Sequence, residues 1–272
     1  MSTTTKSGGL FPALLKYWRG RCGISQLDLA VAADVSSRHI SFLETGRSRP
    51  SRQMVLQLGS ALGLALRDQN ALLVAADFEE AYATPSVDEA LAGPIGDAVT
   101  RMMAQHEPYP MVLMDRLYTV LRANTPAMRM VTDFLAEPEA LVWPFNTFDV
   151  LFDPRLARPF VVGWPVFARA LLSRMQQEAL RRPNDAALAA MVERMFTYPD
   201  VPADFRTPDF SQDSPAVFTL SLKRDQLEVS FLTMATQFSA PQSVMLEELI
   251  IESYFPVDDT TDAYCRAGAP AS

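Results

Sequence analysis

The chain has 272 residues, of which 49 % are hydrophobic and 21 % charged, and this composition excludes an intrinsically disordered protein. Its formal net charge of −8 excludes a protein coated evenly with basic residues. No stretch approaches the roughly 18 uninterrupted apolar residues of a membrane span. The start of the chain has one lysine and no long apolar run, which indicates no signal peptide, so we expect a cytoplasmic protein that has no membrane partner.

The distribution of charge is more informative than its sum. Between residues 16 and 52 there are 7 basic and 3 acidic residues, whereas from residue 81 onward there are 15 basic and 25 acidic residues. Only the N-terminal part is therefore suited to a polyanion such as DNA.

Helical spacing dominates the first eighty residues, which follow a flexible leader expected over 1–9. Ser25, Ser36 and Ser51 are typical N-caps, because a serine hydroxyl accepts a hydrogen bond from a free backbone N–H of the first turn. Asp34 fits a tight turn between two helices, since aspartate tolerates the left-handed conformation. The pattern predicts an all-α domain over 10–80 with five helices, at 10–19, 26–33, 37–44, 52–62 and 67–78.

The second and third of these helices, joined by a three-residue turn, are typical of a helix-turn-helix. The second helix of such a pair enters the major groove with its N-terminal residues toward the bases. Arg38 can bind guanine there, or it is only a solvated surface arginine; His39 contacts DNA or only packs. The predicted contacts with double-stranded DNA are Gln26, Ser36, Ser37, Arg38, His39, Ser41, Arg47 and Arg49.

The string GISQLDLAVAADVSSRHISFLETGRSRPS closely resembles the DNA-binding domain of the Xre/phage-repressor family of bacterial regulators. The resemblance covers roughly residues 10–75 and includes Ser25-Gln26, Leu29-Ala30, Gly46-Arg47 and Pro50-Ser51 at the family's spacing. It implies a lambda-repressor-like fold and sequence-specific DNA binding. The chain departs from the family at Asp34, where the turn usually carries glycine.

After a linker at 81–94, the chain mixes helix and strand patterns, which indicates an α+β domain over 95–256. The sheet has to bring residues near 115 beside residues near 230 or 250. The segment 257–272 is expected to be a flexible tail. Strands are predicted at 111–114, 117–122, 216–222, 227–237 and 244–255, the last either a strand throughout or helical near its start, and helices at 95–105, 125–135, 164–181 and 185–198.

Several short motifs of this second part look like the effector domain of MmyB-like regulators. They include His106-Glu107-Pro108-Tyr109-Pro110, Asp115-Arg116, Phe231-Leu232-Thr233-Met234, Ala240-Pro241 and Leu246-Glu247-Glu248-Leu249. The resemblance implies a PAS-like ligand-binding module fused to an Xre domain, in the order found here.

Methionine and aromatic side chains are concentrated in the second part, with 11 of the 13 methionines between residues 102 and 245. Methionine adapts its shape and lines apolar pockets well, so we expect a small hydrophobic, fatty-acid-like effector; the alternative is that these side chains only form the core. The predicted pocket residues are Met114, Met130, Phe134, Trp143, Phe148, Trp164, Phe167, Phe231 and Met234.

Other sites find little support in the sequence. Cys22 and Cys265 form no CxxC pair, and the 2 histidines lie near no second metal ligand, so neither a zinc site nor a cofactor is expected. His106 beside a proline-rich turn disfavours haem. No GxSxG, Walker or HExxH motif is present, and we predict no enzyme.

We therefore expect a dimeric transcription regulator whose C-terminal domain binds an effector. Two alternatives are a constitutive repressor or adaptor whose second domain only dimerises, and an enzyme with a DNA-binding appendage, which needs a reactive polar cluster. The neighbouring carboxylates Glu247 and Glu248 are interpreted as a solvated edge in an extended segment.

Overall fold

The computed structural model describes residues 9–182, 185–207, 218–239 and 241–268. The first eight residues of the expected leader and the last four of the expected tail lie outside the described residues. The chain divides into two compact units, the first formed by residues 1–90 with 238–247 and the second by residues 91–237 with 248–272.

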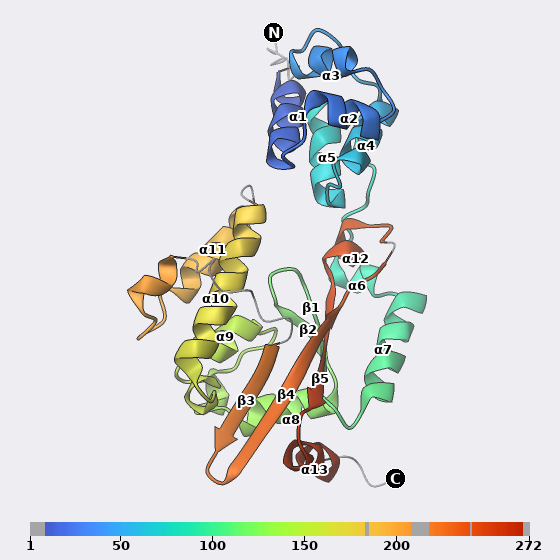
Figure 1. The fold of residues 1–272 in the computed structure, drawn as a ribbon. Coiled ribbons are helices and arrows are strands. Elements are labelled where there is room, and N and C mark those ends of the chain that lie inside the picture. The colour runs from blue at the N-terminus through green and yellow to red at the C-terminus, as the bar shows by residue number, and fades with distance from the viewer. Residues whose placement is uncertain (1–8, 183–184, 208–217, 240, 269–272) are drawn as a thin grey trace, which may run out of the picture. The chain divides into compact units, whose positions relative to one another are not determined.

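The first unit contains the five expected helices (Figure 1). They are α1 (Leu10–Arg21), α2 (Gln26–Ala32), α3 (Ser37–Glu44), α4 (Arg52–Ala61) and α5 (Leu66–Ala75). The three predicted serine caps are confirmed: the hydroxyls of Ser25, Ser36 and Ser51 accept from the backbone N–H three residues later. Each helix contributes buried apolar side chains to one shared core, centred on Leu15, Leu29, Ile40, Leu43, Leu58, Leu72 and Leu73.

Two short helices complete the first unit, α6 (Val87–Ala90) and most of α12 (Val244–Glu248). Ala83 forms a parallel β-bridge with Ser243, and its carbonyl accepts from the N–H of Val244 at 3.0 Å. A segment that follows β4 in sequence therefore folds with the helices of the first unit.

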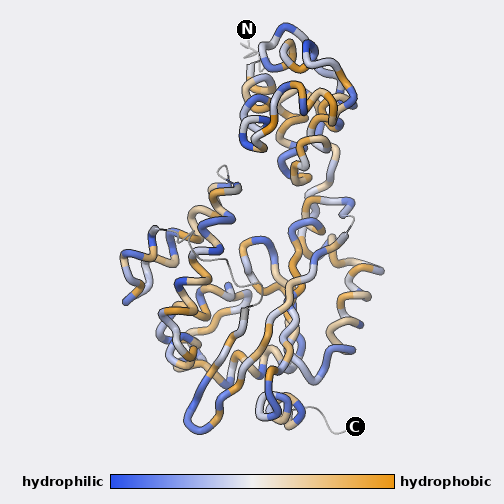
Figure 2. Tube along the Cα trace, viewed as in Figure 1, coloured by the Kyte–Doolittle hydropathy of each residue, from blue (hydrophilic) through white to orange (hydrophobic). Residues whose placement is uncertain are grey.

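The second unit is built on a five-stranded antiparallel sheet. Its strands are β1 (Met111–Met114), β2 (Val120–Ala123), β3 (Phe218–Arg224), β4 (Leu227–Thr236) and β5 (Ile250–Pro256), in the order β2-β1-β5-β4-β3. The register pairs Met114 with Ile250 and Thr233 with Tyr254, so the sheet brings residues near 115 beside residues near 250, as expected. Figure 2 shows that the turn between β3 and β4 is hydrophilic, as its sequence Lys223-Arg224-Asp225-Gln226 requires.

Helices cover both faces of this sheet, so the α+β prediction is confirmed (Figure 1). On one face α7 (Pro94–His106) contacts β1, and the ring of His106 lies 5.2 Å from that of Phe255. The other face holds the main apolar core, together with α9 (Thr147–Phe152), α10 (Trp164–Arg181) and α11 (Ala186–Met195). The helix α8 (Thr125–Asp133) begins at Asn124, whose side chain caps it.

One expectation differs from the structure, and one alternative is decided by it. The segment predicted as a flexible tail contains α13 (Asp259–Ala267), which Asp258 caps and which buries Thr261 and Cys265 completely or nearly so. In the segment 244–255 the alternative of a helical start is confirmed by α12, and the strand β5 is confined to the part from residue 250 onward. The tail was predicted wrongly because α13 gains its structure from packing that the local pattern does not encode.

Candidate functional site

The turn between α2 and α3 has the conformation that the sequence predicts. Asp34 has a positive φ of 49°, which is the left-handed region. The N–H of the next residue, Val35, donates to the carbonyl of Ala30 at 2.8 Å and closes the end of α2. Asp34 therefore adopts the left-handed conformation that glycine favours.

A buried carboxylate fixes α1, α2 and α3 to one another. Glu44, whose side chain is 3 % exposed, accepts from the guanidinium of Arg19 at 2.5 and 3.1 Å. It also accepts from the amide of Gln26 at 2.7 Å. Burial opposes ionisation of Glu44, but the hydrogen bonds from Arg19 and Gln26 prevail and hold its pKa below the usual range. The three side chains fix the angle between the first helix and the helix-turn-helix pair.

The start of α3 presents the polar side chains expected to meet DNA. Ser36, Ser37 and Arg38 are exposed, and His39 and Ser41 are half-buried. The guanidinium of Arg38 lies over the ring of Phe42, 5.2 Å from its centre.

The basic loop that follows α3 adds two more exposed cations to the same unit. The guanidinium of Arg47 lies over the ring of Phe42 at 6.0 Å, and Arg49 is also exposed. The predicted DNA contacts thus come from α3 with its N-cap and the loop after it, except Gln26, which lies at the start of α2 and whose amide is bound to Glu44.

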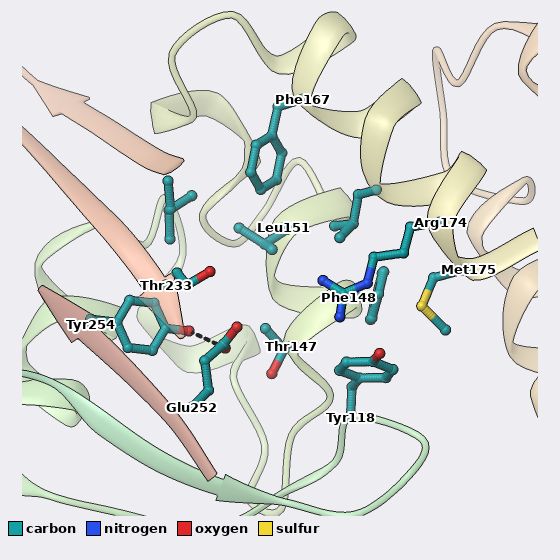
Figure 3. A pocket seen from close by; sticks show the side chains of 12 residues that line it. Tyr118, Thr147, Phe148, Leu151, Phe167, Arg174, Met175, Thr233, Glu252 and Tyr254 are labelled. Carbon is teal, nitrogen blue, oxygen red and sulfur yellow. Dashed lines mark hydrogen bonds between the residues drawn. The ribbon is translucent and has the colours of Figure 1, made fainter. Parts of the chain in front are cut away.

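In the second unit a cavity lies between the sheet and the helices α9 and α10 (Figure 3). It encloses about 60 Å³. Its lining comes from the β1–β2 turn, α9, α10 and three strands, and comprises Tyr118, Thr147, Phe148, Leu151, Phe167, Leu171, Arg174, Met175, Leu220, Thr233, Glu252 and Tyr254.

The cavity has an apolar body and a polar end. Glu252 and Tyr254 stand on the same face of β5, and the tyrosine hydroxyl donates to the carboxylate at 2.7 Å. Burial raises the pKa of Glu252, against the opposing effects of Tyr254 and of the positive charge of Arg174. Figure 3 shows Arg174, on α10, reaching into the cavity across from Glu252. This end of the cavity can hold a polar or anionic group.

Tyrosine hydroxyls also remain protonated here. Burial raises the pKa of Tyr118 to about 12 and holds that of Tyr254 well above its usual value. Both phenols therefore act as hydrogen-bond donors at neutral pH. Among the described residues, no group of three or more His, Cys, Asp or Glu side chains is arranged to hold a metal ion.

Two family models match the chain. Residues 11–73 match a helix-turn-helix domain, and residues 95–267 match the MmyB-like transcription regulator ligand binding domain. The chain belongs to the MmyB-like transcription regulators. No curated protein matches it. The predicted helix-turn-helix and the resemblance to MmyB-like regulators are thereby confirmed, and the chain is a DNA-binding transcription regulator with a ligand-binding domain.

The cavity of the MmyB-like domain includes two of the nine predicted pocket residues, Phe148 and Phe167. Trp143 and Met234 do not line it and are 51 % and 53 % exposed. Met234 follows Thr233, a lining residue, so the alternation of a strand directs it to the opposite face. The others are buried in the core around the cavity: Met114, Met130, Phe134, Trp164 and Phe231.

The sequence prediction missed the polar end of the cavity. The predicted pocket residues were all apolar or aromatic, whereas the polar end is formed by Arg174, Glu252 and Tyr254. One signal was available: Glu252 interrupts the otherwise apolar start of β5, and a carboxylate on the buried face of a strand is rare enough to indicate a functional or paired group.

In the described part of the chain, no helix is long and apolar enough to cross a membrane.

Proposed function

We propose that this MmyB-like regulator binds DNA through α3 and changes its DNA affinity when an amphipathic, fatty-acid-like effector occupies the cavity. One observation carries the proposal: apolar walls from α9 and α10 lead to a polar end formed by Arg174, Glu252 and Tyr254. Pockets for small molecules combine these features, with apolar walls for affinity and a few polar groups for orientation.

The polar end suits a carboxylate head group. Arg174 supplies a positive charge, and the raised pKa of Glu252 favours its neutral form, which donates a hydrogen bond rather than repelling an anion. An alkyl chain would then lie against Phe148, Leu151 and Phe167.

The cavity is small for such a ligand. Its 60 Å³ lie well below the ~300–1,000 Å³ of ordinary ligand pockets, so its walls have to move on binding. The half-buried side chains of Phe167 and Leu171, on α10, are the parts of the wall best able to do so. A required movement is also the means by which occupancy can alter the rest of the protein.

We further propose that the protein acts in the cytoplasm as a homodimer. Helix-turn-helix proteins pair on half-sites about one helical turn, ~34 Å, apart. The net negative second unit is unsuited to contact with DNA, so we expect only the first unit of each copy to bind the operator.

The test is native mass spectrometry of the purified full chain, followed by denaturing extraction of whatever it carries. A stoichiometric amphipathic carboxylate, or saturable binding of added laurate that Arg174→Met weakens at least about tenfold, supports the proposal. The Arg155→Met variant removes a cation that pairs with Asp153 and does not line the cavity, and it serves as the control. A ligand-free mass together with no saturable laurate binding would instead favour the constitutive repressor.

A further inference from the structure

The chain leaves the effector-binding unit between β4 and β5 and folds with the DNA-binding unit before it returns. Both strands line the cavity, β4 through Thr233 and β5 through Glu252 and Tyr254. Residues 241–247 between them belong to the first unit. They are fixed there by the bridge between Ser243 and Ala83, and Val244 is 1 % exposed.

The last residue of this segment caps a helix of the DNA-binding unit. The carboxylate of Glu247 accepts from the N–H of Leu66, the first residue of α5, at 2.7 Å. Ala65 occupies the N-cap position and makes no side-chain cap of its own. A carboxylate is a favourable partner there, because the first N–H groups of a helix lack acceptors and carry partial positive charge.

The helix that Glu247 caps is central to its unit. α5 packs against both α1 and α4, and it contributes Leu72 and Leu73, both fully buried, to the shared core. Any change at the start of α5 therefore reaches the helices that support α2 and α3.

The next residue is fixed in the effector-binding unit. The carboxylate of Glu248 lies 3.5 Å from the guanidinium of Arg116, and their side chains are only 13 % and 18 % exposed. Arg116 also pairs with Asp185, the N-cap of α11. It stands in the β1–β2 turn two residues before Tyr118, which lines the cavity.

Two consecutive carboxylates are thus anchored in different units, and neither is the solvated edge that the sequence suggested. They lie at the end of α12, where neighbouring side chains diverge, and not in an extended segment. Glu248 is only four residues before Glu252 on the polar end of the cavity.

We propose that Glu247 and Glu248 form the coupling element through which effector occupancy reaches the DNA-binding unit, an inference that rests on the proposed function. A ligand that displaces Tyr118 or Glu252 shifts Arg116 and the start of β5, and with them Glu248. Glu247 is the adjacent residue, so the shift changes how it holds the first turn of α5. Glu247 is accordingly a positioning residue that contacts neither effector nor DNA.

The experiment needs neither effector nor operator. Amide hydrogen exchange is measured on the full chain for α5 in the wild type, in Arg116→Gln, in Glu247→Ala and in the double variant. We expect Arg116→Gln, a change in the second unit, to raise exchange in α5 about fivefold or more, the lower end of ordinary coupling between sites. In the Glu247→Ala background the same change should add nothing.

Two control variants test whether the effect on α5 is specific to Arg116 and Glu247. Arg155→Gln breaks another ion pair of the second unit, to Asp153, and should leave α5 unchanged. Glu89→Ala removes a capping carboxylate of the first unit that accepts from the N–H of Ser86, and should not abolish the effect of Arg116→Gln.

The proposal is overturned if α5 does not respond to Arg116→Gln, or if it responds equally with and without Glu247. Should Arg116→Gln unfold the second unit, Glu248→Gln removes one charge of the same pair while keeping the shape of the side chain. The exchange experiment uses no effector, so its result does not depend on whether laurate binds. A failed laurate experiment would contradict only the proposed effector, and an unresponsive α5 would contradict only the coupling element.

Discussion

At the scale of single residues, Glu252 is a carboxyl group in a buried environment of the effector-binding unit. It faces the cavity, where burial raises its pKa, while the hydroxyl of Tyr254 and the charge of Arg174 favour its ionised form. A carboxyl group with a raised folded-state pKa lowers stability as the pH rises from its unfolded value through the folded one, since deprotonation leaves a poorly solvated charge. The same deprotonation repels an anionic head group.

The resulting prediction concerns the pH dependence of laurate binding. We expect affinity to fall as the pH rises through the raised pKa of Glu252. In Glu252→Gln, which stays neutral and can still accept from Tyr254, this step should vanish and the unit should gain stability above that pKa. Calorimetric titrations across pH 5–9 measure the affinity, and thermal unfolding over the same range measures the stability. A flat wild-type binding profile would show that Glu252 does not meet the head group.

Glu44 is the opposite case, a buried carboxylate that its partners keep ionised. Burial works against ionisation, but Arg19 and Gln26 lower its folded-state pKa, so the stabilisation exists above the unfolded pKa and is lost as the pH falls through the folded value. Glu44→Ala leaves Arg19 without this partner and should destabilise the first unit by about 3 kcal/mol.

The slowest-exchanging amides of α1 and α3 report this loss, because their exchange follows opening of the whole unit. Glu79→Ala, which removes an exposed carboxylate of the same unit, is the matched control. If the two variants exchange alike, the network contributes nothing to stability, and the acid sensitivity expected below about pH 4.5 should be missing too.

At the scale of elements, α13 shows how a polar segment can be structural. The hydroxyl of Thr261 accepts from the N–H of Ser230 on β4 at 2.9 Å, and Thr261 is fully buried. Arg129 on α8 lies over the ring of Tyr264 at 4.1 Å. The helix thus satisfies a backbone donor of the strand that it covers.

Replacing Thr261 by valine keeps the shape and removes the acceptor. A buried N–H left without a partner costs about 1–3 kcal/mol, so Thr261→Val should destabilise the second unit by this amount. Thr260→Val changes an exposed neighbour on the same helix and should be nearly neutral. Thermal unfolding of both variants decides the matter, and equal melting temperatures would mean that α13 only rests on the sheet.

The elements also show what the sequence can and cannot predict. The helix-turn-helix was predictable because its signals are local: serine caps, apolar spacing, and Asp34 in the left-handed turn. The cavity was not, because its lining joins residues from 118 to 254. Local alternation separates Thr233 from Met234, but only the packing of α9 and α10 decides which face of β4 is lined by a pocket. The helix α13 was missed because only Thr261 and Cys265 are buried in it.

At the scale of the whole molecule, the distribution of charge indicates which part of the chain binds DNA. Basic residues outnumber acidic ones between residues 16 and 52, and the reverse holds after residue 81, in a chain of net charge −8. A net negative protein binds DNA only where its basic residues are concentrated, so binding should depend on a few cations and fall steeply with salt.

Arg38 and Arg49 should therefore contribute to DNA binding in different ways, Arg38 to base recognition and Arg49 to contact with the phosphates. With operators selected from random DNA by the full chain, Arg38→Ala should cost about 1–3 kcal/mol of affinity and relax the preference at one base pair. Arg49→Ala, in the loop, should weaken binding to all sequences and reduce the salt dependence by about one phosphate contact. Arg155→Ala serves as the control.

The form of the selected sites tests the dimer at the same time. Two α3 helices related by a twofold axis should select an inverted repeat with half-sites about one turn, ~34 Å, apart. Single, unpaired half-sites bound with unchanged affinity would exclude a dimer as the DNA-binding form. If Arg38→Ala behaved as Arg49→Ala does, the arginine would be a phosphate contact, and base recognition would then fall to the other exposed residues at the start of α3, Ser36 and Ser37.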